Sequence, residues 1–219
     1  MKAVSSIRRA AQIREIFWPI LGRLKEVDEF FDREFEHAQP MVRDVCTYVL
    51  RSGGKRLRPG LVLLISRMLS YAGERDIRYG AVVEMIHTAT LIHDDIIDQS
   101  DLRRGRPTAN SKWGNQTTVL VGDWLYSRAM DLCLEFGDVD VMRLLVTATL
   151  RMTEGEILAD QERGRINIDV PRRIRSVTPA INDIMISGSG MFESAGSGVR
   201  PVVLYGYRES YSMCITAWS

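Results

Sequence analysis

Residues 84–108 read Glu-Met-Ile-His-Thr-Ala-Thr-Leu-Ile-His-Asp-Asp-Ile-Ile-Asp-Gln-Ser-Asp-Leu-Arg-Arg-Gly-Arg-Pro-Thr, and the rest of the chain is organised around them. In a helix, His87, Asp94 and Asp98 stand at i, i+7 and i+11. At about 100° per residue, these three side chains fall within about 40° of one another. The stretch therefore predicts a helix with an imidazole and two carboxylates on one face.

The surroundings of the two aspartates are apolar, because Ile92, Ile96 and Ile97 flank them. A buried pair of carboxylates is unfavourable without a counter-charge, so the pair needs either a shared proton or a hard divalent cation such as Mg²⁺. Three arginines follow at residues 103, 104 and 106, which suits a polyanion bridged by metal. The alternative is an amphipathic helix with a solvated acidic face and a basic turn. We favour the metal, because few other ionisable residues occur between residues 81 and 97.

The segment His-Thr-Ala-Thr-Leu-Ile-His-Asp-Asp-Ile-Ile-Asp and the following Leu-Arg-Arg-Gly-Arg-Pro-Thr resemble the first aspartate-rich region of the trans-isoprenyl (polyprenyl) diphosphate synthases, in particular the octaprenyl-type long-chain enzymes. The resemblance implies an all-helical, Mg²⁺-dependent prenyltransferase that is a homodimer. Such an enzyme ionises an allylic diphosphate and adds isopentenyl diphosphate to the resulting cation.

A second segment, residues 52–59, reads Ser-Gly-Gly-Lys-Arg-Leu-Arg-Pro. Its glycines free the backbone, its cations cluster, and Pro59 is suited to open a helix over Gly60–Ser70. Backbone N–H groups beside lysine and arginine form an anion site, and the alternative is a basic surface turn. The segment also resembles the isopentenyl diphosphate-binding segment of the same family, and it precedes the aspartate region as it does there.

The resemblance assigns roles to individual residues. Asp94 and Asp98 would hold Mg²⁺, and Asp95 would be a further ligand or a group that supports the ligands. Arg103 would contact the allylic diphosphate and, with the two metal ligands, would be catalytic. Isopentenyl diphosphate would be bound by Lys55, Arg58, His87 and Arg104. His93 lies off the carboxylate face, and we expect it to be structural.

Product length depends on the floor of the substrate cavity. Helical side chains lean toward the N-terminus, so the positions four and five residues before Asp94 are the natural floor. These are Thr90 and Ala89, which are small where the resemblance places bulky aromatics in short-chain synthases. We therefore expect a medium-to-long-chain product.

Composition limits the other function classes. The 219 residues carry a net charge of +1, which argues against a general nucleic-acid binder. Three widely spaced cysteines show neither a disulfide framework nor a metal-site spacing, which fits a reduced cytoplasmic protein. No apolar run has the length of about 20 residues that a transmembrane helix needs, and we identify no signal peptide.

Helical periodicity extends over most of the first three quarters of the chain. It predicts amphipathic helices over residues 6–37 with a break at Pro19, and further helices over Val42–Leu50, Val119–Cys133 and 138–163. Residues 111–115 read as a short loop, and Gly122 suggests a close helix contact. Glu154 and Glu156 would either line the cavity or serve a helix cap or an ion pair.

The pattern changes at about residue 164. Residues 187–198 contain four glycines and four serines, which is typical of a flexible segment. No lysine follows Lys112 and no second Asp-Asp pair occurs, so the family's Lys-Thr contact and its second aspartate motif are missing. We therefore expect a helical domain over residues 1–163 and an atypical, disordered or frame-shifted tail over residues 164–219.

The predicted fold is an antiparallel all-α bundle around a deep apolar cavity. Three functions remain open: a polyprenyl diphosphate synthase, impaired by the missing second motif; a non-catalytic partner subunit of a heteromeric synthase; and a terpene cyclase. The cyclase is the weakest hypothesis, because Gly-Gly-Lys-Arg-Leu-Arg-Pro has no use where no second diphosphate binds. Against the partner subunit stands the intact set of aspartates and arginines.

Overall fold

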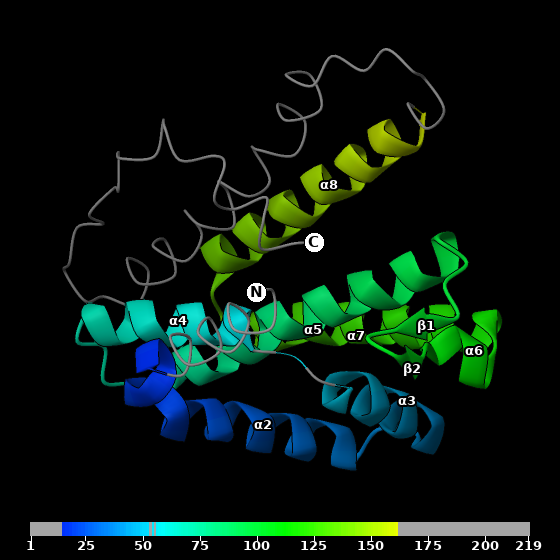
Figure 1. Cartoon of the computed structure of the whole chain (residues 1–219). Coiled ribbons are helices and arrows are strands. Elements are labelled where there is room, and N and C mark those ends of the chain that lie inside the picture. The colour runs from blue at the N-terminus through cyan, green and yellow to red at the C-terminus, as the bar shows by residue number, and fades with distance from the viewer. Residues whose placement is uncertain (1–14, 53, 55, 162–219) are drawn as a thin grey trace, which may run out of the picture.

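The computed structural model describes residues 15–52, 54 and 56–161, and the regular secondary structure of this part is helical apart from one short hairpin (Figure 1). The elements are η1 (Trp18–Ile20), α2 (Leu21–Glu36), α3 (Pro40–Arg51), α4 (Leu57–Met68), α5 (Arg75–Ile97), β1 (Leu102–Arg103), β2 (Arg106–Pro107), α6 (Ala109–Trp113), α7 (Asn115–Glu135) and α8 (Val139–Gln161). The prediction of an all-α bundle is confirmed. Residues 164–219, for which we expect an atypical tail, lie outside the described part.

Helix α5 is the centre of the bundle. Its buried residues include Val82, Met85, Ala89 and Ile92, which recur every three or four positions and form an apolar stripe. Among the described elements, α5 makes its most extensive contact with α7, followed by α4 and α2. Figure 1 shows α5 and α7 side by side in the middle of the molecule. The helix that carries the predicted site is therefore held on several sides.

The N-terminal helices follow the local signals of the sequence. The expected break at Pro19 is the short 3-10 helix η1, after which α2 buries Val27, Phe31 and Phe35 at four-residue spacing. Helix α3 begins with Pro40, and the side chain of Gln39 accepts a hydrogen bond of 2.9 Å from the N–H of Met41. Both helices pack against the central pair.

Some predicted boundaries were wrong. The loop predicted over residues 111–115 contains most of helix α6, which forms because Ala109 is buried and the Trp113 ring packs edge-on against Tyr48 at 5.1 Å. Helix α4 begins at Leu57 rather than Gly60, and α7 begins at Asn115 rather than Val119. In these cases tertiary packing extends helices beyond their local signals. Among the described helices, none combines the length and apolar character needed to cross a bilayer.

Candidate active site

The carboxylate face lies at the C-terminal end of α5. Asp94 is half-buried in the last turn, and Asp98 is the C-cap, whose N–H donates to the carbonyl of Asp94 at 2.8 Å. Burial raises the pKa of Asp94 above its ordinary value, and the charges of Glu156 and Asp98 raise this pKa further. Glu156 belongs to α8, so that helix brings a third carboxylate toward the predicted pair.

Asp95 differs from its two neighbours because its partner is already in place. It is 7% exposed, and Arg103 Nε donates to both of its carboxylate oxygens, at 2.8 and 3.0 Å. A second guanidinium nitrogen of Arg103 lies 2.8 Å from Asp95 Oδ1. Such a forked pair fixes the plane of the guanidinium. Asp95 therefore holds Arg103 in position beside the carboxylate face.

A cluster of cations surrounds His87, about two turns before Asp94. Burial is the largest cause of the lowered pKa of His87, which is about 3, and the charges of three nearby arginines also lower it. These are Arg58, Arg103 and Arg104. A Cβ atom placed on Gly54 would lie 3.7 Å from a guanidinium nitrogen of Arg104, so this arginine reaches the Gly-Gly segment.

The hairpin between α5 and α6 delivers Arg103 and Arg104. Leu102 pairs with Pro107, and Arg103 with Arg106. The two turn residues, Arg104 and Gly105, have φ values of 53° and 76°, as a tight hairpin turn requires. The Tyr48 hydroxyl donates a 2.7 Å hydrogen bond to the Pro107 carbonyl and so ties the hairpin to α3.

Arg103 connects the two halves of the site, because its charge acts on both His87 and Asp94. The structure thus brings together predicted site residues from α4, α5 and the hairpin: Arg58, His87, Asp94, Asp95, Asp98, Arg103 and Arg104. Lys55 lies outside the described residues. Within the described residues, no group of three or more histidine, cysteine or acidic side chains is arranged to hold a metal ion by itself.

The two residues predicted to set product length lie in the turn before the aspartates. Ala89 is 2% exposed, and Thr90 is partly buried with its hydroxyl bonded to the His87 carbonyl at 2.8 Å. One turn after Ala89 and on the same side of α5, His93 contacts α7, where its Nε2 lies 3.3 Å from Asp123 Oδ1. This contact agrees with a structural role for His93.

Sequence reasoning missed several supporting residues. Arg56 pairs with Glu84 and Asp28, and Tyr48 anchors the hairpin. Arg56 belongs to the quoted cation cluster and Glu84 to an otherwise apolar helix, so an unusual charge was the available signal for both. Nothing in the sequence pattern pointed to Tyr48.

Comparison with known proteins agrees with this arrangement. The polyprenyl synthetase family model matches residues 39–177. The all-trans-nonaprenyl-diphosphate synthase (geranyl-diphosphate specific) of Rhodobacter capsulatus is 41% identical over 150 residues, which are 66% of this chain and 45% of that protein. The heptaprenyl diphosphate synthase component 2 of Geobacillus stearothermophilus is 33% identical over 186 residues, which are 82% of this chain and 56% of the relative.

A solved structure shows the same architecture. The polyprenyl synthase from Caulobacter crescentus, in complex with calcium and isoprenyl diphosphate, superposes with a TM-score of 0.76 at 26% identity, covering 86% of this chain and 57% of that one. The chain thus spans about half the length of the relatives that it matches. The matched residues include both the Gly-Gly-Lys-Arg segment and the aspartate helix. The chain belongs to the polyprenyl synthetase family.

Proposed function

We propose that this chain is a polyprenyl diphosphate synthase, which condenses isopentenyl diphosphate with an allylic diphosphate in a Mg²⁺-dependent, head-to-tail reaction. The observation that carries the proposal is the position of Arg103 between a carboxylate face and a cation cluster. Two diphosphates need two anion sites, one of which is served by metal. A face of carboxylates beside a cluster of arginines supplies both.

The donor set fits Mg²⁺. Burial raises the pKa of Asp94, and the charges of Glu156 and Asp98 raise it further, so a divalent cation would stabilise the ionised carboxylate. Mg²⁺ commonly takes one or two protein carboxylates and completes its shell with water and substrate phosphates. Two ligands from one helix therefore form a half-site that a substrate diphosphate completes. When bound, the ion would offset the negative charge that develops as the allylic C–O bond breaks.

The protein residues divide the remaining work. Arg103, fixed by Asp95, neutralises the leaving diphosphate from a guanidinium whose orientation is set in advance. Arg58, His87 and Arg104, with Lys55, hold isopentenyl diphosphate so that its double bond faces the allylic carbon. His87 is neutral at pH 7, so it adds hydrogen bonding to the arginine charges rather than a further cation.

Product length follows from the turn before Asp94. Ala89 is small and buried, and a bulky aromatic at this position would limit the room for a growing chain. We propose a medium-to-long-chain product. The name of the nonaprenyl relative supports this proposal. Homodimerisation, a cytoplasmic location and a domain boundary near residue 163 are further parts of the proposal.

The alternative is a non-catalytic partner subunit. The 33% identical relative from Geobacillus stearothermophilus is one component of a heptaprenyl diphosphate synthase. A subunit that only assists would lack turnover alone and would change the products of a complete synthase.

One assay separates the two proposals. The purified chain is incubated with Mg²⁺, labelled isopentenyl diphosphate and geranyl diphosphate, alone and together with a complete homologous synthase. Products formed by the chain alone, and lost on addition of a chelator, would support the enzyme. If the chain forms no product by itself but changes the product length of the complete synthase in the mixture, the partner subunit would be supported.

A further inference from the structure

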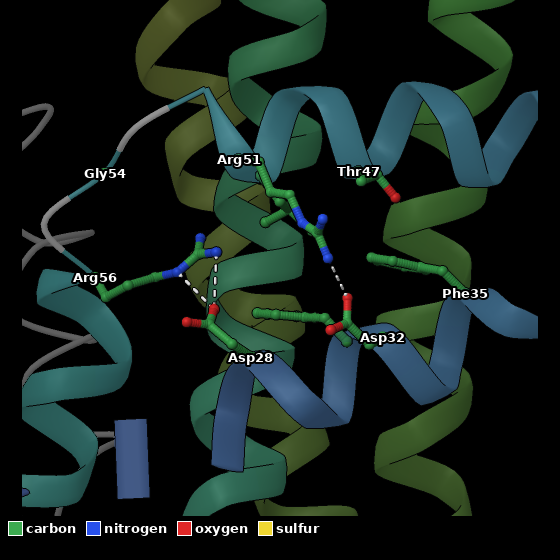
Figure 2. Close-up of a pocket in the computed structure, with 9 residues that line it drawn as sticks. Asp28, Asp32, Phe35, Thr47, Arg51, Gly54 and Arg56 are labelled. Atoms are coloured by element: carbon green, nitrogen blue, oxygen red, sulfur yellow. Dashed lines mark hydrogen bonds and ion pairs between the residues drawn. The ribbon is translucent and has the colours of Figure 1, made fainter. Parts of the chain in front are cut away.

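Two ion pairs bracket the segment between α3 and α4. The two pairs lie across a pocket whose lining includes Phe31, Phe35, Leu50 and Gly54. Figure 2 shows both ion pairs. Arg56 pairs with Asp28 at 3.0 Å, and Arg51 pairs with Asp32 at 2.9 Å. Both acids belong to α2 and stand one helical turn apart, so each end of the connection is tied to the same helix.

The two pairs differ in burial. The side chains of Arg51 and Asp32 are 67% and 64% exposed, which is typical of a surface pair that contributes little. The Arg56 side chain is 18% exposed and has a second partner, because a guanidinium nitrogen lies 3.1 Å from Glu84 Oε1. Glu84 is 9% exposed as a side chain, and the Arg56 guanidinium also stands 5.5 Å from the centre of the Phe31 ring. Arg56 thus joins α2 and α5 from a semi-buried position.

The backbone at Arg56 needs this support. Its φ of +47° lies in the left-handed region, which is unfavourable for a residue with a Cβ atom. Arg56 is the N-cap of α4, and its carbonyl accepts a 2.9 Å hydrogen bond from the N–H of Gly60. Sparsely populated backbone conformations persist where surrounding contacts enforce them. Here the contacts are those of the Arg56 side chain.

The fixed turn determines where Arg58 lies. Arg58 follows two residues later in the first turn of α4, and the charge of Glu84 acts on it as well. Glu84 also stands one turn before His87 on α5. The Arg56–Glu84 pair is therefore placed to set Arg58 against His87, which are two members of the proposed isopentenyl diphosphate site.

We propose that Arg56 is a positioning residue for isopentenyl diphosphate: through Glu84 and Asp28 it holds the start of α4, and thereby Arg58, in the geometry that binds the diphosphate. The inference rests on the proposed function. Arg56 acts through Arg58 and makes no contact with substrate. Its planar, forked guanidinium is required, because one side chain must serve acids on two helices.

The test compares four variants of the full chain. Arg56→Met removes the charge and keeps an unbranched side chain, and Arg56→Lys restores the charge without the fork. Glu84→Gln weakens the α5 anchor alone. Arg51→Met is the matched control, because it removes the neighbouring exposed pair on α2. Thermal unfolding of each variant establishes that it is folded.

Two measurements are made on each variant: calorimetric binding of isopentenyl diphosphate, and amide hydrogen exchange over residues 57–61. For Arg56→Met we expect affinity to fall about tenfold and exchange to rise about tenfold, as for a partner removed from a semi-buried charged pair. Arg56→Lys should recover part of both effects, and Glu84→Gln should lose part of both. Arg51→Met should stay within about twofold of the unmodified chain.

The outcomes distinguish a failure of the positioning role of Arg56 from a failure of the proposed function. Exchange and affinity unchanged in Arg56→Met would overturn the positioning role, and so would an equal loss in Arg51→Met. Faster exchange in Arg56→Met with unchanged affinity would show that the anchor is structural only, which also overturns it. If the unmodified chain binds no isopentenyl diphosphate, the proposed function fails, and the role of Arg56 in binding fails with it.

Discussion

At the scale of single residues, the surroundings of His87 change its pKa strongly. Its pKa is lowered to about 3 by burial and then by Arg58, Arg103 and Arg104, whereas an unfolded histidine titrates near its ordinary value of 6.5. As the pH falls below 6.5, His87 becomes protonated in the unfolded state. In the folded state it stays neutral until the pH approaches about 3. Folding stability is therefore lost across this window as the pH decreases.

We expect His87→Gln to remove this loss. In the unmodified chain, His87 alone should lower the free energy of unfolding by about 2 kcal/mol between pH 7 and pH 5, because the unfolded histidine is then mostly protonated. Urea unfolding gives the free energy of unfolding of the chain and of the variant at both pH values. The change between pH 7 and pH 5 in the chain, minus the same change in the variant, is the contribution of His87. Equal pH dependence in the two proteins would show that His87 is not held neutral by folding.

We propose that Ala89 determines product length. Each added isoprene unit contributes several buried CH₂ groups at about 0.8 kcal/mol each, provided that the cavity stays open. A chimera with the C-terminal half of a family member grafted after residue 163 should release medium-to-long chains, and Ala89→Phe should shorten them on chromatography. Thr90→Ser, which keeps a small side chain, is the control and should leave the length unchanged. A C15 product from the unmutated chimera would contradict the assignment.

At the scale of elements, the contact between α5 and α7 holds the aspartate helix in place. From the sequence, Gly122 indicated a close helix contact without naming the partner, and the structure identifies the partner as α5, because a Cβ atom there would clash with the His93 ring. His93 also lies 3.3 Å from the Val119 carbonyl, so the ring has partners that it would lose by moving. The glycine therefore permits a close approach of two long helices.

Gly122→Ala should destabilise the protein by about 1 kcal/mol, because overpacking outweighs the better helix propensity of alanine. In the background of His93→Ala, Gly122→Ala should destabilise the protein less than it does in the unmodified chain, because removal of the imidazole ring removes the clash. Gly22→Ala is the matched control: it also lies in a helix but has open space around its Cβ position, so it should be neutral or stabilising. Stability is read by chemical unfolding. Equal effects at Gly22 and Gly122 would refute the close contact.

Long periodic helices could be predicted from the sequence, and the short elements could not. Helix α5 is 23 residues long and buries Val82, Met85, Ala89 and Ile92 at helical spacing, so its type was clear. Each strand of the hairpin has two residues, too few for an alternating pattern, and α6 has five. These elements are defined by tertiary contacts such as that between Tyr48 and Pro107.

At the scale of the whole molecule, the site is assembled from parts that the sequence separates. The motif residues could be named in advance because their spacing on α5 and their resemblance to a family are local properties. Burial is the largest cause of the pKa shifts of Asp94 and His87, and partners from other helices add to it: Glu156 from α8 raises the pKa of Asp94, and Arg58 from α4 lowers that of His87. The resemblance grouped Arg58 with His87 in advance, but burial and the strength of these charge effects depend on packing, so only the folded chain reveals them.

The central claim is that Asp94 and Asp98 together hold Mg²⁺ against an allylic diphosphate. Asp101 is the natural control, because it lies beyond the end of α5, is exposed, and accepts a hydrogen bond from the Ser111 hydroxyl at 3.2 Å. The decisive measurement is calorimetric binding of a non-hydrolysable allylic diphosphate analogue, with and without Mg²⁺, to the variants Asp94→Ala, Asp98→Ala and Asp101→Ala. We predict that the Mg²⁺-dependent affinity falls at least about tenfold for the first two and stays within about twofold for the third. Equal losses in all three variants, or Mg²⁺-dependent binding that survives Asp94→Ala and Asp98→Ala, would contradict the claim.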